Sequence, residues 1–141
     1  MQYHRSLGFT FMELLISVAI TAALIAISIP TYVHYKRQFY YQAVVTAAEG
    51  YQSAVTKCIQ NQNGNINACY GGQHGIPENI THGTGALATV IVQHGIITAT
   101  PRAAYGITSH HTYILTPKII QHRIVWTATG EGCKRDFAQN C

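Results

Sequence analysis

Acidic side chains are scarce in this sequence. Its 141 residues hold five Asp plus Glu against nine Lys plus Arg, and Asp136 is the one aspartate. Calcium needs several oxygen ligands, and Glu131 with Asp136 alone are too few to supply them. The same scarcity accounts for the formal net charge of +4. A basic nucleic-acid face would need clustered Lys and Arg, whereas Lys36-Arg37 and Lys134-Arg135 are only short pairs.

The sequence also lacks the short motifs of metal and catalytic sites. It has no CxxC, no HExxH and no HxH, although it has eight histidines. Adjacent His110 and His111 would point to opposite faces of a strand. We therefore expect the histidines to be scattered over a polar surface, and we expect no metal site, no cofactor and no enzymatic activity.

Four cysteines, Cys58, Cys69, Cys133 and Cys141, lie in the polar part of the chain. Because metal-site spacing is missing, two disulfides formed in an oxidising compartment suit them better. Four cysteines allow three connectivities, and proximity in the sequence favours Cys58 with Cys69 and Cys133 with Cys141. Each bond would then close a short loop and stabilise this small domain by roughly 2 to 4 kcal/mol.

Hydrophobic residues make up 48% of the chain and crowd toward its N-terminus. The largely apolar run from Phe9 to Ile29 would span about 30 Å as a helix, which is the thickness of a bilayer core. A secretory signal has a shorter run followed by a small-residue cleavage site. Here the small residue, Gly8, precedes the run, so a cut after Gly8 would leave the helix on the mature chain.

Glu13 is the anomaly within that run. A carboxylate in hydrocarbon costs on the order of 3 kcal/mol or more, so it is a functional candidate whose partner must be found. Cleavage between Gly8 and Phe9 would create a positive amine one helical turn before Glu13, and a staggered neighbouring subunit could present that amine to the carboxylate. The alternative is a side chain that snorkels from the helix end.

The string from Gly8 to Leu15, Gly-Phe-Thr-Phe-Met-Glu-Leu-Leu, resembles the prepilin processing motif of type IV pilins and pseudopilins. The resemblance implies that residues 1–8 are a leader peptide removed by prepilin peptidase. It also implies that Phe9 becomes the N-methylated mature N-terminus and that Glu13 guides the docking of subunits. Leu7 departs from the pattern, because the family often has Lys or Arg directly before the Gly.

The resemblance continues beyond this motif. Pro30 stands where the family often has a helix-kinking proline, and Tyr32 and Tyr35 match aromatic residues commonly found just after it. The segments 113–117 and 123–127 look like the C-terminal strands of one subgroup of type IVa pilins. The family fold is α+β, with a long N-terminal helix packed on a small antiparallel sheet and a C-terminal disulfide loop.

The residue pattern predicts the same elements. A helix is expected from about Phe9 to about Ile59, bent near Pro30, with a membrane half and an amphipathic half. Strands are expected over 86–93, over 112–116 up to Pro117, and over 119–129, with a fourth over 96–100 or 104–108. Trp126 is expected to anchor the sheet on the helix. The apolar stripe of the amphipathic half is predicted to comprise Ile29, Val33, Tyr40, Val44, Ala47, Tyr51 and Val55.

Three parts of the chain follow: a leader over 1–8, a transmembrane and filament-core helix over 9–30, and a periplasmic or extracellular globular domain over 31–141. The surface loop from Gln60 to Asn67 is expected to face other subunits or a receptor.

The resemblance implies a structural subunit that waits in the inner membrane of a Gram-negative bacterium. It is then cut by prepilin peptidase and polymerised with copies of itself, by the pilus assembly machinery, into an extracellular filament. Adhesion, twitching motility and DNA uptake are the expected outputs, with a host receptor or DNA as outside partners. The alternatives are a pseudopilin of a type II secretion system and a DNA-binding minor pilin.

Overall fold

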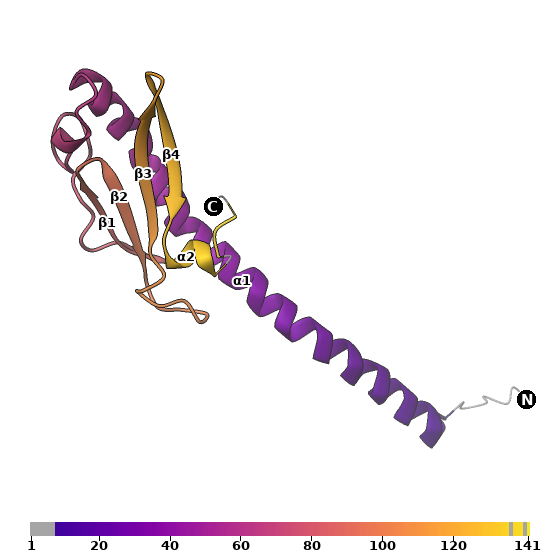
Figure 1. Ribbon diagram of the computed structural model, residues 1–141. Helices are drawn as coiled ribbons and strands as arrows, with labels where there is room; N and C mark the ends of the chain where they lie inside the picture. The colour runs from indigo at the N-terminus through magenta and orange to yellow at the C-terminus, as the bar shows by residue number, and fades with distance from the viewer. Residues whose placement is uncertain (1–7, 136, 140) are drawn as a thin grey trace, which may run out of the picture. The chain divides into compact units, whose positions relative to one another are not determined.

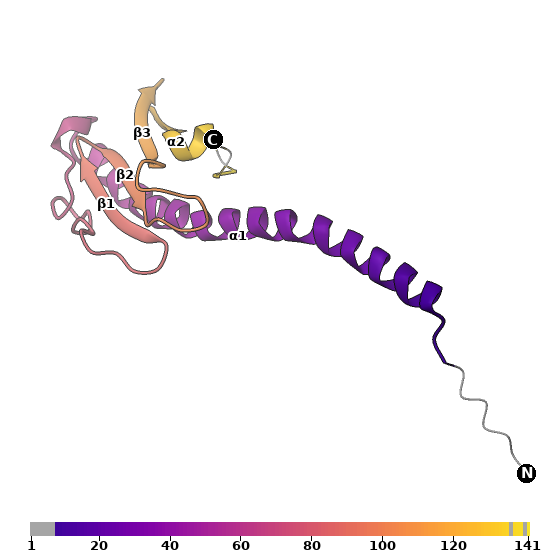
Figure 2. The same ribbon diagram turned by 90° about the horizontal axis from the view of Figure 1, so that it is seen from below.

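The computed structural model describes residues 8–135, 137–139 and 141 (Figures 1 and 2). The chain forms two compact units that divide between Tyr35 and Lys36. Helix α1 (Phe11–Asn61) begins in the first unit and ends in the second, which also contains the sheet. The α+β fold class predicted from the sequence is confirmed.

The second half of α1 buries one face within the second unit. The prediction placed Tyr40 and Ala47 on this face, but the structure buries them only in part. The buried face is shifted by one residue from the predicted one toward the C-terminus. Each turn of a packed helix has two adjacent positions that can point inward, and the apolar spacing of the sequence fits either position. The buried residues of α1 are Tyr41, Val44, Val45, Ala48, Tyr51, Val55, Cys58 and Ile59.

A four-stranded antiparallel sheet covers that face of α1 (Figure 1). Its strands lie in sequence order, and side chains alternate between buried and half-exposed over 97–101 and 113–117 of the two central ones. Of the two segments predicted to hold the fourth strand, the first is correct, since Ala104 and Ile107 form only an isolated bridge. The strands are β1 (Leu87–Gln93), β2 (Ile96–Pro101), β3 (Tyr113–Ile120) and β4 (Arg123–Thr129).

The predicted end of a strand at Pro117 is wrong, because β3 continues to Ile120. A two-residue turn with positive φ at Gln121 and His122 joins β3 to β4. Hydrogen-bonded pairs alternate from this turn, so Pro117 falls in a non-hydrogen-bonded pair with Trp126. The missing N–H of Pro117 therefore faces away from β4, beyond the last residue that β2 pairs with, and no ladder bond is lost.

Side chains of α1 fasten three loops to the helix. The hydroxyl of Tyr41 donates to the carbonyl oxygen of His111 at 2.8 Å, and the hydroxyl of Tyr51 donates to that of Glu78 at 2.7 Å. The Arg37 Nε donates to the carbonyl oxygen of Tyr105 at 2.8 Å. Buried tyrosines thus satisfy their hydroxyls on loop backbone, as aromatic residues with a polar end usually do. Burial raises the pKa of Tyr41 well above its usual range.

The C-terminal segment packs on the same part of α1. The short helix α2 (Glu131–Lys134) brings Gly132 so close to Tyr41 that a methyl group on Gly132 would overlap the tyrosine hydroxyl. The ring of Phe137 lies 5.8 Å from the ring of Tyr41 and 5.0 Å from that of His111. Position 132 is therefore open only to glycine.

Substituting Gly132 tests this contact. Gly132→Ala should lower the free energy of unfolding by about 1 to 3 kcal/mol, because the added methyl forces Tyr41 out of place. The matched control is Gly50→Ala, where nothing lies within 4 Å of the new methyl group and a helical alanine should gain about 0.5 to 1 kcal/mol. Denaturant unfolding of the full chain in detergent, followed by near-UV circular dichroism, measures both. Equal stability of the two variants would contradict the packing described.

Candidate functional site

The first candidate residues surround the start of α1. Thr10 immediately precedes the helix, and its hydroxyl oxygen accepts the backbone N–H of Glu13 at 3.2 Å. The Thr10 carbonyl oxygen accepts the N–H of Leu14 at 3.1 Å. Thr10 is therefore the N-cap, and Glu13 is the third helical residue, as in the Thr-x-x-Glu capping box. Our sequence reasoning missed this role of Thr10, although the spacing that signals it is present.

The apolar half of α1 presents little free polar surface. Hydroxyl groups bond back to carbonyl oxygens four residues earlier: Ser17 to Glu13 and Thr21 to Ser17, both at 2.8 Å. Ser28 bonds Leu24 at 2.8 Å and Thr31 bonds Ile27 at 3.2 Å in the same way. Such bonds hide hydroxyls from an apolar medium. In the part of the chain described, no side chain bonds the Glu13 carboxylate, so in an apolar environment this group would need a partner from elsewhere.

Gly8 and Phe9 precede the helix and are both exposed, Phe9 to 76%. A peptidase could therefore reach the bond between them. Residues 1–7, the rest of the predicted leader, lie outside the described residues. The predicted roles of Gly8 and Phe9 in cleavage and N-methylation stay predictions.

Every described residue from 8 to 35 is exposed, including the large apolar side chains. By length and composition, α1 could cross a membrane, and its apolar stretch near the N-terminus is not buried within the molecule. Pro30 lies inside α1 without ending it. Since proline has no N–H, the carbonyl oxygen of Ala26 loses its helical donor, which is a local weak point where a helix can bend.

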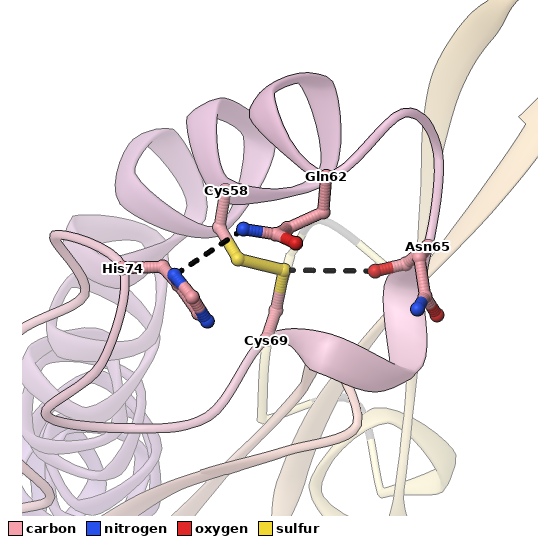
Figure 3. Close-up of a disulfide and its surroundings, with 5 residues drawn as sticks. All are labelled: Cys58, Gln62, Asn65, Cys69 and His74. Atoms are coloured by element: carbon pink, nitrogen blue, oxygen red, sulfur yellow. Dashed lines mark hydrogen bonds between the residues drawn. A yellow bond between two sulfur atoms is a disulfide. The ribbon is translucent and has the colours of Figure 1, made fainter.

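Two disulfides have the pairing that proximity favoured. Cys58 at the end of α1 joins Cys69, with Cα atoms 6.0 Å apart (Figure 3). Across this bond the Gln62 Nε2 and the His74 Nδ1 are 3.2 Å apart in a hydrogen bond. The Cys69 sulfur lies 4.0 Å from the Asn65 carbonyl oxygen, a contact only, since a disulfide sulfur has no hydrogen to donate. The loop is thus clamped to the helix by a covalent and a polar link.

The second disulfide joins Cys133 of α2 to Cys141, with Cα atoms 5.5 Å apart. Beside it, the Lys134 Nζ lies 2.6 Å from the Glu131 carboxylate on an exposed face. The hydrogen bond from Lys134 lowers the pKa of the Glu131 carboxyl. Asp136, the other carboxylate considered for calcium, lies outside the described residues. Lys134, considered for DNA binding, has part of its charge offset by Glu131.

The histidines do not converge within the described ranges. His74 bonds Gln62, the His94 Nδ1 is 3.0 Å from the Tyr70 hydroxyl, and the Thr108 N–H donates to the His111 Nδ1 at 2.8 Å. Each ring therefore serves a separate loop. Among the residues that the structure describes, no group of three or more His, Cys, Asp or Glu could hold a metal ion.

Comparison with known proteins bears on the first of these sites. Residues 3–29 match the family described as "Prokaryotic N-terminal methylation motif". The matched segment contains Gly8, Phe9, Thr10 and Glu13, which are the residues at the exposed start of α1.

Two relatives extend the likeness into the globular unit. "Prepilin peptidase-dependent protein D" of Escherichia coli (strain K12) is 33% identical over 93 residues, which are 66% of this chain and 62% of that protein. "Type IV major pilin protein PilE1" of Neisseria gonorrhoeae is 33% identical over 102 residues, 65% of this chain and 42% of that protein. The matches cover less than two thirds of the length of either relative.

Loss of the Thr10 cap should loosen the first turn of α1. Thr10→Val keeps the shape of the side chain but removes the acceptor, which costs about 1 kcal/mol. We expect amide hydrogen exchange at Glu13 to speed up roughly fivefold, measured by NMR on the full chain in detergent micelles. Thr10→Ser keeps the acceptor and is the control. Exchange at Glu13 that is equally slow in all three proteins would show that Thr10 does not cap the helix.

Proposed function

Because the chain is a type IV pilin-like protein, we propose that it is a structural subunit of a type IV pilus, cut by a prepilin peptidase and polymerised into a surface filament. The observation that carries this proposal is the exposed start of α1, where one carboxylate, Glu13, stands in an apolar helix within the matched methylation motif. Its role is structural and not enzymatic.

The proposed assembly step pairs Glu13 with a neighbouring subunit. Cleavage between Gly8 and Phe9 frees a positive amine, and the amine of one copy meets the Glu13 carboxylate of the next. Each Glu13 lies at the N-terminal end of α1, where the helix dipole favours a negative charge. Left unpaired in the apolar core, a charged carboxylate would cost roughly 3 to 5 kcal/mol, so the pair fixes the stagger between subunits.

The apolar half of α1 supplies the cohesion of the filament. Before assembly the inner membrane of a Gram-negative bacterium covers its exposed side chains, and after assembly the helices of other copies do so. Hydroxyls bonded back to the helix allow this transfer, because they need no water in either setting. Pro30 gives the helix a point at which to adjust during packing.

The globular unit would then form the outer surface of the filament. Adhesion, twitching motility or DNA uptake are the outputs proposed for it, with the pilus assembly machinery as an inner partner and a host receptor or DNA as an outer one. The name of the gonococcal relative, a type IV major pilin protein, supports a pilus over a secretion system. A type II secretion pseudopilin and a DNA-binding minor pilin share the same leader and are the alternatives.

Removing the Glu13 charge tests the assembly role. Glu13→Ala should leave the protein stable in the membrane yet lower its amount in filaments by at least roughly tenfold, since each 1.4 kcal/mol is a factor of ten. Shearing filaments from the cells and comparing them with the membrane fraction by immunoblot measures this. Ser17→Ala is the matched control, because it also removes a polar group from the apolar half of α1 but only one that is satisfied within the helix.

Two results would contradict the proposal. Filaments of Glu13→Ala at the wild-type level would reject the docking role of the carboxylate. Sequencing the N-terminus of subunits from wild-type filaments should find methylated Phe9, and subunits that keep residues 1–8 would reject the processing step.

A further inference from the structure

The two outer edges of the sheet differ. Along β1, the loop before the sheet covers the outward main-chain groups: Ile80 and Val90 exchange two hydrogen bonds, of 2.9 and 2.8 Å. The side-chain oxygen of Asn79 accepts the N–H of Val92 at 2.8 Å. This edge is closed to further pairing. Two more bonds on it run from Gly83 to the Ala88 carbonyl and from Gly71 to the Val92 carbonyl.

The outer edge of β4 is open. The turn after β3 makes Ile120 and Arg123 a hydrogen-bonded pair, and bonded pairs alternate from there. The N–H and C=O groups of Ile124, Trp126 and Ala128 therefore point away from β3. In the ranges that the structure describes, no backbone or side-chain group bonds any of them. The outer edge of β4 thus has three backbone N–H donors and three C=O acceptors available for hydrogen bonding.

A groove runs beside this open edge, between β4 and the solvent side of α1. Ile124 and Trp126 supply its apolar side, and α1 lines the other side with polar and charged residues: Glu49, Gln52, Ser53, Thr56, Lys57 and Gln60. The Trp126 Nε1 donates to the Thr56 hydroxyl at 3.3 Å, so the indole is held in place and its half-exposed ring faces the groove. The groove is a shallow, open hollow of about 560 Å³.

We propose that the outer edge of β4 binds an extended segment of another protein as a fifth strand. The six main-chain groups match a partner strand of about five or six residues. Alternate side chains of that strand point to the α1 side of the sheet and enter the groove. Since Ile124 and Trp126 give the groove an apolar wall, the segment carries apolar residues at the alternate positions that meet this wall.

The occupant is a different polypeptide and not a second copy. The free edge of a second copy is its own β4, and two β4 strands would pair about a twofold axis, a contact that closes on itself. Subunits of a filament need head-to-tail contacts. This choice of occupant rests on the proposed function, whereas the open edge does not.

Strand addition can be tested with a peptide of stated sequence. The probe is an eight-residue peptide of alternating Thr and Val, blocked at both ends, added to the full chain in detergent micelles. Amide hydrogen exchange at Ile124, Trp126 and Ala128 should slow at least tenfold at saturating peptide, while exchange at Val90 on the closed edge should not change. No filament is needed, so failure here is distinct from failure of the proposed assembly.

The matched control peptide has the same side chains with alternate amides N-methylated, which removes its donors along one edge. It should not slow exchange. On the protein, Ala128→Pro removes one outward N–H without touching the β3 ladder, and it should weaken peptide binding at least tenfold relative to Ala128→Val, which keeps that N–H. The N-methylated peptide keeps the test decisive if the proline variant fails to fold.

Three results would overturn the proposal. The first is unchanged exchange at the three amides up to roughly 1 mM of the alternating peptide, a concentration that reveals even weak specific binding. The second is equal protection by the N-methylated peptide, because side-chain contacts alone would then explain it. The third is protection that appears without peptide and grows with protein concentration, which would make a second copy the occupant.

Discussion

The first half of α1 has no cover of its own, and the rest of the molecule follows from that constraint. Its large apolar side chains are exposed from Phe9 onward, at a cost of roughly 25 cal/mol for each Å² left in water. An apolar environment would therefore be needed to remove this surface from water. In an apolar environment the Glu13 carboxylate would also need a charged partner, which the described residues do not supply.

The second half of α1 differs, because other parts of the same chain cover its apolar face. The sheet, three loops and the C-terminal segment cover a face of α1 whose buried residues run from Tyr41 to Ile59. Three side chains of the helix bind the loops through their carbonyl oxygens. The two halves of α1 therefore differ in their side chains: the first is apolar and exposed, and the second buries one face within the globular unit.

The elements could be predicted from the sequence where local signals are strong. The apolar run, the proximity of the cysteines and the strands rich in β-branched residues all led to the elements observed. Pro117 misled the prediction because its effect depends on which edge its missing N–H faces, and that follows from the turn at Gln121 and His122. Of the candidate site, Gly8, Phe9 and Glu13 could be found by resemblance, whereas the cap by Thr10 and the open edge of β4 depend on geometry.

The Cys58–Cys69 bond has a mechanical consequence. A filament under load would pull on each subunit through α1, and the bond fastens the last turns of that helix to the loop that closes the β1 edge. The two cysteines are 11 residues apart. At roughly 3.3 to 3.6 Å for each stretched residue, and with the two Cα atoms already 6.0 Å apart, the disulfide prevents the loop from lengthening by about 30 Å. A pulling force that reaches Cys58 would thus be transmitted through the disulfide to the sheet and would not extend the loop between the two cysteines.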